Sequence, residues 1–331
     1  MVILSGGDSK RYKQKGRLID KALMEVNAKP LLFKIVEDGL NNYDNVIVSL
    51  NNNKRKKKYE RVLKPLLKED NVDFVEDDKE ISFIGVGKGI ASVLSKLLMK
   101  TSIQFIPCDR PYLDVKLLRQ LETVNEGVTI LNYQNGLIEP LLALYDENYT
   151  FPPSFVFSLN LSRADVFIRL APRIRLYDVT EIIKVNNLES SFFANVNTPM
   201  VDAYNLSLEK EKYLLPKSKI VERKKIEHLD VIDLIDNPDD RIHHLIEREH
   251  FYLAFLVTKY LFRNQVFDFN LFSYYVNIAL KSEYEYWMEK NIPFLGLHAL
   301  QDLSHSFKNN VSNEIDIEIK TLKEKIGIKK K

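Results

Sequence analysis

The residues best suited to chemistry on an anion stand at the start of this 331-residue chain. Gly6 and Gly7 follow the short apolar run Val2–Leu4, and the cations Arg11 and Lys21 come soon after them. A strand that breaks into a glycine turn before a helix presents several backbone N–H groups in one direction, where they can hold an anion. Because the pattern is neither a Walker loop nor a GxGxxG fingerprint, it indicates phosphate without saying which phosphate. The alternative is an ordinary tight turn, since glycine serves any position with positive φ.

Alternating apolar runs and amphipathic stretches predict the elements that position this turn. After the first strand we expect buried strands at Asn45–Leu50, Val72–Val75, Ser102–Asp109 and Val128–Tyr133. We expect the intervening helices over residues 31–40, 54–67, 90–99 and 111–121. Short connections between such elements are typical of βαβ units, so the sequence predicts an α/β fold with a Rossmann-like, mostly parallel sheet. Ligands of these sheets bind beyond the carboxyl ends of the strands, where we expect the loops SGGDSKR, LNNN, VEDD and PCDRP to converge.

The C-terminal part of the chain has a different character. From about Asn205 to Lys331 the strand signal fades, and long stretches show the helical spacing of apolar residues. We therefore predict two domains, an α/β domain over residues 1–204 and an all-helical module over residues 205–331. For the module we consider two roles, a gate for a substrate site and a contact with a protein partner.

Composition excludes several classes of protein. Lys and Arg (48) nearly balance Asp and Glu (46), and a net charge of +2 argues against a protein that coats a polyanion, so we expect no nucleic-acid partner. The single cysteine, Cys108, excludes an internal disulfide framework and favours a reducing compartment. The apolar stretch Phe251–Phe262 contains Lys259 and is shorter than the roughly 20 residues of a membrane helix. We expect a soluble, cytoplasmic protein without a membrane span.

A run of cations occupies Lys54–Lys58. Such runs are usually a solvated helix face. The alternative is a surface for a phosphorylated acceptor or nucleic acid, since clustered Lys and Arg neutralise phosphates. Single-stranded nucleic acid would also require exposed aromatic side chains, and Tyr59 is the one aromatic residue close by.

Four ordered motifs give the chain a family resemblance. They are LSGGDSKRYK…DK at the start, CDRP around Asp109, then EPLLALY and finally NVNTP. Over about residues 1–204 they resemble the nucleotidyltransferase family whose best-known member is molybdenum cofactor guanylyltransferase, which typically carries L-A-G-G-x-S-x-R-M-G…D-K, C-D-x-P, E/Q-P-L-x-A-x-Y and N-x-N-T-P. The chain departs from this pattern at Tyr12-Lys13, which replaces Met-Gly, in the longer stretch from Arg11 to Lys21, and at GVGKG, where the family has GPLxG.

The resemblance implies an activity and a cofactor. It implies transfer of a nucleoside monophosphate from an NTP, with GTP favoured, to a small phosphorylated acceptor such as molybdopterin, with release of pyrophosphate. It also implies Mg²⁺, which prefers one or two carboxylates together with phosphate oxygens. Such chemistry depends on charge neutralisation and in-line positioning more than on covalent catalysis.

The resemblance also implies roles for particular residues. The nucleotide is expected to contact the backbone of Leu4, Ser5, Gly6 and Gly7. Arg11 and Lys21 are expected to stabilise charge on the α-phosphate and the leaving pyrophosphate, and Asp109 is expected to bind the metal. The alternative for Asp109 is a helix N-cap before Pro111, which is an equally common use of Asp.

Four further polar residues match positions of the family pattern. Asn52 lies in a polar loop that helps to select the base, and Asp77 stands where the family carries an acidic residue that recognises the base or the acceptor. Asn195 and Asn197, within NVNTP, are expected near the metal or the acceptor phosphate. The alternatives are a generic loop for Asn52, a solvated acidic turn for Asp77, and turn formation for Asn195 and Asn197.

Other activities and a non-enzymatic role remain open at this stage. Cytidylyl transfer to the same acceptor, or nucleotidyl transfer to a sugar phosphate, would use the same residues. A regulatory or nucleic-acid-associated protein that kept the fold without the activity is favoured by the altered opening motif and the added helical module. The presence of Arg11, Lys21 and Asp109 together argues against that role.

Overall fold

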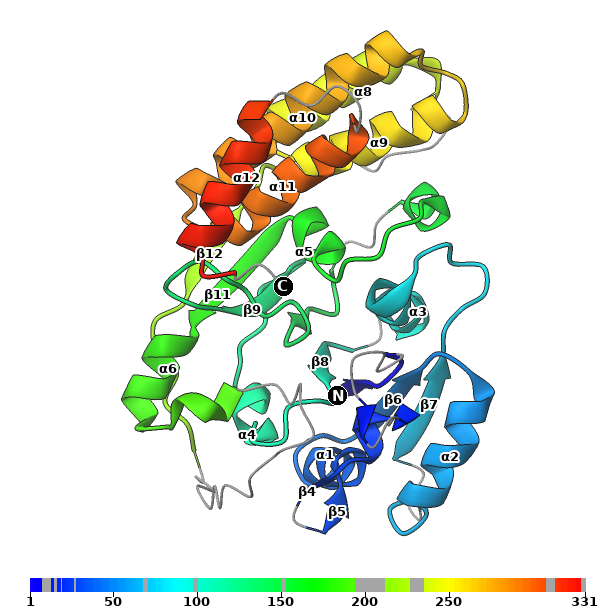
Figure 1. Ribbon diagram of the computed structural model, residues 1–331, viewed down its shortest axis with the longest axis vertical. Helices are drawn as coiled ribbons and strands as arrows, with labels where there is room; N and C mark the ends of the chain where they lie inside the picture. Colours follow the sequence, from blue (N-terminus) through cyan, green and yellow to red (C-terminus); the bar gives the residue numbers. More distant parts are fainter. Residues whose placement is uncertain are drawn as a thin grey trace.

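The chain folds into an α/β part and a helical region that lies along one side of it (Figure 1). The computed structural model describes residues 1–7, 13–14, 17–18, 20–26, 28–67, 71–97, 101–149, 153–193, 212–226, 235–307 and 313–328. Within these ranges no helix is long and apolar enough to cross a membrane.

The α/β part is built on an eight-stranded sheet in the order β12-β11-β9-β10-β8-β1-β6-β7. Six strands run in one direction: β1 (Val2–Leu4), β6 (Val46–Leu50), β7 (Val72–Glu76), β8 (Ile103–Pro107), β9 (Val128–Asn132) and β11 (Arg173–Asp178). The other two, β10 (Leu144–Tyr145) and β12 (Lys219–Glu222), pair antiparallel with their neighbours. The predicted α/β class with a mostly parallel sheet is therefore confirmed.

The strands at the centre of the sheet end at the same level. In the register of β1, Leu4 is aligned with Ser49 of β6 and with Pro107 of β8. Residues that follow these three strands therefore leave the sheet side by side. The glycine turn after β1 and the CDRP segment after β8 are two such neighbours.

Helices cover both faces of the sheet, and alternate side chains of each strand enter different cores. Val2 and Leu4 face a core shared with α3 (Gly85–Leu97) and α5 (Val166–Leu170), whereas Ile3 faces the opposite core. The opposite core is covered by α1 (Leu31–Leu40), α2 (Asn53–Leu63), α4 (Val115–Arg119) and α6 (Val179–Asn186). The shorter elements are η1 (Lys21–Leu23), η2 (Ser154–Ser158), η3 (Ser190–Phe193), β2 (Lys13–Gln14), β3 (Arg17–Leu18), β4 (Glu25–Val26) and β5 (Lys29–Pro30).

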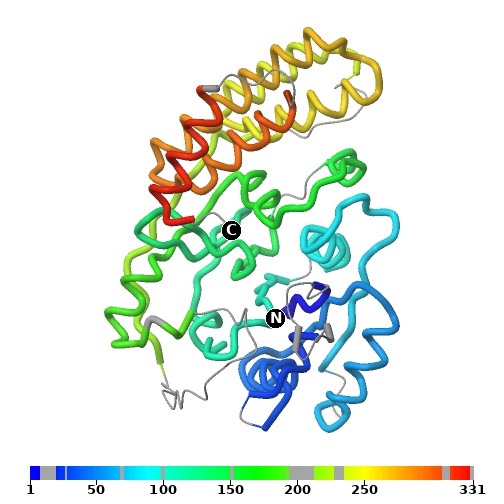
Figure 2. The backbone as a smooth tube through the Cα atoms, viewed as in Figure 1, coloured from blue at the N-terminus to red at the C-terminus, as the bar shows by residue number. Residues whose placement is uncertain are grey.

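In the described residues of the C-terminal region the helices are α8 (Pro238–Glu247), α9 (Phe251–Arg263), α10 (Phe269–Glu289), α11 (Pro293–Ser306) and α12 (Asn313–Lys325). They lie together on one side of the sheet, as the backbone trace also shows (Figure 2). This confirms the predicted C-terminal helical region. The core on the α3 side continues without a break into this region, because Leu256 of α9 and Trp287 of α10 belong to the same buried cluster as Val2.

One strand lies where an all-helical module was expected. Lys219–Glu222 forms β12, the outer strand of the sheet, and pairs with β11 in register from Arg173 to Leu176. Only Val221 of this strand is buried. A strand of four residues with one buried side chain does not show the alternation of apolar and polar residues that predicts a strand. The predicted boundary between residues 204 and 205 lies outside the described residues and stays a prediction.

Two helices begin at places that the sequence did not indicate. The glycines of GVGKG form the first turn of α3, which starts at Gly85, and they do not form a separate turn before it. The helix expected from Pro111 is confined to Val115–Arg119, and its N-cap is Asp114, whose side chain accepts a hydrogen bond from the backbone N–H of Lys116.

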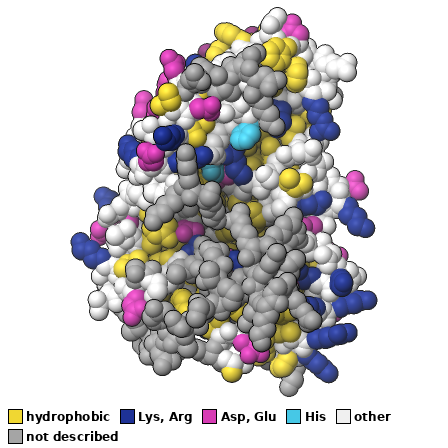
Figure 3. Space-filling model, viewed as in Figure 1, with side chains coloured by type: hydrophobic (Ala, Val, Ile, Leu, Met, Phe, Trp, Pro, Cys, Tyr) yellow, Lys and Arg dark blue, Asp and Glu magenta, His cyan; other side chains and the backbone are white. Residues whose placement is uncertain are grey.

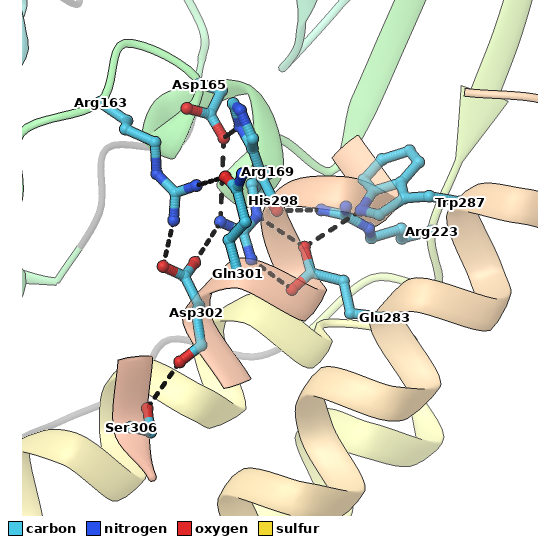
Figure 4. A network of polar contacts seen from close by, with 10 residues as sticks. All are labelled: Arg163, Asp165, Arg169, Arg223, Glu283, Trp287, His298, Gln301, Asp302 and Ser306. Carbon is cyan, nitrogen blue, oxygen red and sulfur yellow. Dashed lines mark hydrogen bonds and ion pairs between the residues drawn. The ribbon is translucent and has the colours of Figure 1, made fainter. Parts of the chain in front are cut away.

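A buried network of ions joins the α/β part to the helical region (Figure 4). Arg169 of α5 is fully buried and donates hydrogen bonds to both carboxylate oxygens of Glu283 in α10, at 2.8 and 2.7 Å. It also bonds Oδ2 of Asp302 in α11, at 2.6 Å. Arg223, just after β12, donates to the backbone O of Arg169 at 2.7 Å. The helical region is therefore held to the sheet through paired charges that are removed from water.

A second buried group makes the stability of the helical region depend on pH. His250, at the start of α9, is 3% exposed, and its Nε2 lies 2.8 Å from the backbone O of Lys224. Burial, together with the positive charge of Arg223, lowers the pKa of His250 to about 4. An unfolded histidine has a pKa near ~6.5, so between pH 6.5 and 4 the unfolded state binds a proton that the folded state does not. The contribution of neutral His250 to the free energy of unfolding is therefore fully present above the unfolded pKa. It is lost as the pH falls from that value toward the folded pKa of about 4.

We expect His250 to reduce the free energy of unfolding by about 2 kcal/mol when the pH is lowered from about 7.5 to about 5. Urea denaturation of the wild type and of His250→Gln at both pH values measures this. The variant is expected to lose less stability than the wild type over the same pH interval. An equal loss in the two proteins would show that His250 titrates normally in the folded state.

Candidate functional site

A cavity of about 230 Å³ opens at the carboxyl ends of β1, β6 and β8. The sequence-predicted residues that line it are Leu4, Ser5, Gly6, Gly7, Lys21, Asp77 and Asp109. Loops that follow separate strands thus meet in one cavity, as expected of a parallel sheet. Ser49, Asp20 and Leu141 line it as well.

Lys21 and Asp109 face each other across this cavity. The Nζ atom of Lys21 lies 3.4 Å from Oδ2 of Asp109, and the two side chains are 19% and 25% exposed. Lys21 is held by η1, whose N-cap Asp20 accepts a hydrogen bond from the backbone N–H of Ala22 at 3.2 Å. A cation and a carboxylate that both remain accessible to solvent are able to exchange this pairing for contacts with a charged ligand.

Asp109 does not cap a helix, which was the alternative role for this residue. The cap of α4 is Asp114, so the Asp109 carboxylate stays in the cavity. Its neighbour Arg110 turns inward, where it forms an ion pair with Glu139 and donates to the backbone O of Phe193. Glu139 is the acidic residue of EPLLALY, so that motif anchors the segment that carries Asp109.

The glycine turn is supported from behind by side chains of α2. Arg55 contacts the backbone of Ser5 and Gly7, and Tyr59, one helical turn later, is fully buried beneath the turn. Ser5 is fixed to β6 through two bonds to the backbone O of Ser49, from its N at 3.0 Å and from its Oγ at 2.7 Å. The N–H of Ser5 is therefore used within the sheet and is not directed at a ligand.

A comparison with protein families decides what kind of domain this cavity belongs to. Residues 1–153 match the model described as MobA-like NTP transferase domain. This N-terminal part of the chain is therefore similar to MobA-like NTP transferase domains. A search of the curated proteins finds no match for the chain.

The match confirms the predicted resemblance for the N-terminal part of the chain. It includes the opening motif, CDRP and EPLLALY, and it ends before NVNTP. Asn195 and Asn197 of NVNTP lie outside the described residues, as does Arg11, so their predicted roles stay predictions. The NTP transferase domain accounts for the strands from β1 to β10.

Asp77 of the transferase domain lies at the α3 side of the cavity. Its backbone N–H donates to the O of Leu50 at 3.0 Å, which continues the pairing of β6 with β7. Burial raises the pKa of its carboxyl group, and the positive charges of Lys88 and Arg55 act in the opposite direction. A Cβ at Gly89 of α3 would lie 3.6 Å from Oδ1 of Asp77, which is an ordinary contact, and 3.2 Å from Oγ of Ser49, which is a tight one.

Asn52 is not among the residues that line the cavity. It is exposed and caps α2, since its Oδ1 accepts a hydrogen bond from the backbone N–H of Arg55 at 3.0 Å. Its predicted contact with the nucleotide base stays a prediction. In the Lys54–Lys58 run, Lys54, Lys57 and Lys58 are exposed, whereas Arg55 and Lys56 are partly buried. Figure 3 shows cations gathered over α2 at the lower right.

The transferase cavity suits a metal ion that arrives with a nucleotide. The described residues contain no cluster of three or more His, Cys, Asp or Glu that would form a ready-made metal cage. The carboxylate of Asp20 is already engaged by Tyr59 and Arg55, whereas Asp109, beside Lys21, is 25% exposed. One carboxylate combined with phosphate oxygens is a common arrangement for Mg²⁺, so Asp109 fits this ion.

Cys108 also lines the cavity without being suited to act as a nucleophile. Burial, together with the charges of Asp109 and Asp20, raises the pKa of its thiol to about 12. Because the thiolate is the reactive form of cysteine, this group stays protonated and unreactive at neutral pH.

The helical region contacts segments that flank the transferase cavity. Gly136, which has a φ of +79°, packs so closely on the start of α11 that a Cβ there would lie 2.2 Å from Cδ of Pro293. This loop leads into Glu139, the partner of Arg110. On the α3 side, a Cβ at Gly87 would lie 3.2 Å from the backbone O of Arg163, which forms an ion pair with α11. The helical region therefore contacts the Gly136 loop directly and is connected to α3 through Arg163.

Several of these residues were missed by sequence reasoning. Arg55 and Tyr59 stand four residues apart, so helical periodicity places them on one face of α2. Because residues 54–58 are all Lys or Arg, the sequence did not indicate that Arg55 faces inward. Glu139 belonged to a quoted motif, but nothing local indicated that its partner is Arg110, 29 residues earlier.

Proposed function

We propose that the chain is a nucleotidyltransferase that transfers a nucleoside monophosphate from an NTP to a phosphorylated acceptor and releases pyrophosphate. The NTP transferase domain supports the reaction class. The observation that carries the proposal is the meeting of the glycine turn, Lys21 and Asp109 in one cavity at the ends of β1 and β8. On the composition of the chain, with its single cysteine, we further propose a cytoplasmic location.

In the proposed reaction an oxygen of the acceptor phosphate forms a bond with the α-phosphorus of the NTP. The bond between the α-phosphorus and the oxygen that links it to the β-phosphorus breaks, and pyrophosphate leaves with the electron pair of that bond. Lys21 binds and orients the phosphates, and Asp109 holds the position of the metal. Bound Mg²⁺ would neutralise the negative charge that develops on the phosphates. The chain therefore contributes positioning and charge stabilisation, which suits this chemistry.

We propose GTP as the first nucleotide to test. The half-buried carboxylate of Asp77 at one side of the cavity is an acceptor for N–H groups, and guanine presents two neighbouring donors, on N1 and N2. Molybdopterin is the first acceptor to test, on the strength of the motifs shared with molybdenum cofactor guanylyltransferase. CTP with the same acceptor, and sugar phosphates as acceptors, are the next pairs.

A pyrophosphate-release assay tests the proposal. Each of the four NTPs with Mg²⁺ is combined with a panel of phosphorylated acceptors, and a thermal-shift screen identifies the NTP that stabilises the folded chain. We expect pyrophosphate release with at least one pair and a rise in melting temperature with the same NTP. If no pair gives turnover and no NTP raises the melting temperature, the enzymatic function is wrong and a non-catalytic role is favoured.

A further inference from the structure

Arg55 connects both ends of the segment that separates the glycine turn from Lys21. Its Nη2 donates to the backbone O of Gly7 at 3.0 Å, and its Nη1 donates to the backbone O of Ser5 at 3.1 Å. On the other side its Nε lies 3.4 Å from Oδ2 of Asp20, the residue before Lys21. One guanidinium group thus contacts Gly7 and Asp20, the described residues on either side of this segment.

Arg55 makes these contacts from outside the lining of the cavity, whereas its partner Asp20 lines the cavity. Ser5 and Gly7 line the cavity, whereas Arg55 does not. The carbonyl oxygens of Ser5 and Gly7 therefore point toward a side chain that does not line the cavity. Because a peptide unit is planar and trans, its N–H points opposite to its C=O. The N–H of Gly6, which shares a peptide unit with the O of Ser5, is thereby directed away from Arg55.

The charge of Arg55 is balanced locally, so it does not act on a ligand directly. The side chains of Arg55 and Asp20 are only 15% and 13% exposed. The hydroxyl of Tyr59 lies 3.1 and 3.0 Å from the two carboxylate oxygens of Asp20, and burial, with the charge of Asp20, raises the pKa of Tyr59. Tyr59 thus stays protonated and donates to Asp20.

The position of Arg55 in α2 is unfavourable for the helix itself. It stands in the first turn, after the N-cap Asn52, and this turn contains no acidic residue. A cation there opposes the helix dipole, whose positive end is at the N-terminus. Local helix stability therefore does not explain an arginine at this position, but its contacts with Ser5, Gly7 and Asp20 do.

We propose that Arg55 is a positioning residue that sets the phosphate-binding geometry of the glycine turn and places Lys21 relative to it. This inference rests on the proposed function, because the phosphates in question are those of the NTP. The planar fork of arginine is required, since two of its nitrogens bind two separate carbonyl oxygens while a third contacts Asp20. A lysine would supply the charge without this geometry.

Arg55→Lys and Arg55→Gln test this inference against Lys57→Gln, which removes an exposed cation from the same helix. Affinities for Mg²⁺·GTP, tripolyphosphate and guanosine are measured by calorimetry for each protein, at a temperature where circular dichroism shows all of them to be folded. We expect both Arg55 variants to bind GTP and tripolyphosphate at least about tenfold more weakly and guanosine unchanged. Lys57→Gln is expected to bind all three as the wild type does.

The outcomes separate this inference from the proposed function. Wild-type affinity for tripolyphosphate in Arg55→Lys would overturn the geometric role, because charge alone would then be sufficient. An equal loss of guanosine and tripolyphosphate affinity would overturn it too, since it would indicate a general disturbance of the cavity. Failure of the wild type to bind any NTP would instead contradict the proposed function, and with it this inference.

Discussion

Asp109→Asn is expected to lower kcat by about 10²–10³-fold while leaving the fold intact. The carboxylate lies in the cavity beside Lys21 and takes no part in capping α4. Asparagine keeps the shape of the side chain but removes the charge that would hold a metal ion against the phosphates. Loss of a single group that stabilises transition-state charge has an effect of this size.

The measurement is steady-state pyrophosphate release over a range of Mg²⁺ concentrations. We expect the variant to require more Mg²⁺ for half-maximal rate. Asp73→Asn is the matched control, because Asp73 is exposed on β7 and does not line the cavity. Near-normal kcat and Mg²⁺ dependence in Asp109→Asn would remove this residue from the catalytic machinery.

Glu283→Gln is expected to lower the free energy of unfolding by about 3–5 kcal/mol, because it removes the carboxylate that binds the buried Arg169 through two hydrogen bonds. Glu283 is 1% exposed and accepts two hydrogen bonds from Arg169 and one from Trp287, at 3.0 Å. Arg223 lies in the same network, so the loss affects both the α/β part and the helical region.

Urea denaturation followed by circular dichroism and by the fluorescence of Trp287, the single tryptophan, measures this effect. We expect one transition with both probes, because the core on the α3 side is continuous with that of the helical region. Glu222→Gln is the control, since Glu222 is 56% exposed in its pair with Arg173, and its loss should cost less than about 1 kcal/mol. Two separate transitions, or an effect of Glu283→Gln as small as that of the control, would show that the network does not join the two parts.

The features that the sequence predicted correctly are those that a few neighbouring residues indicate by themselves. The apolar runs of β1, β6 and β8 and the polar residues directly after them are visible in short windows, and parallel packing then brings their ends together. For this reason the strand pattern alone predicts that the glycine turn, Asp77 and Asp109 meet in one crevice, whereas Lys21 is indicated by the family resemblance. The family resemblance added an expected role for each of them.

The features that the sequence did not predict depend on contacts between distant residues. Arg169 and Glu283 are 114 positions apart, and nothing near either residue indicates its partner. Arg55 stands in a run whose other members are mostly exposed, and only the fold distinguishes it from them. β12 is recognisable from its pairing with β11 and not from its own four residues.

The most direct test of a nucleotidyltransferase uses GTP labelled at different phosphates. The wild type is incubated with Mg²⁺, the acceptor that supports turnover and either [α-³²P]GTP or [γ-³²P]GTP, and the acceptor is then separated. We predict that the α-label enters the acceptor and that the γ-label is released as pyrophosphate. Entry of the γ-label into the acceptor would identify phosphoryl transfer and would contradict the function proposed for the cavity at the ends of β1 and β8.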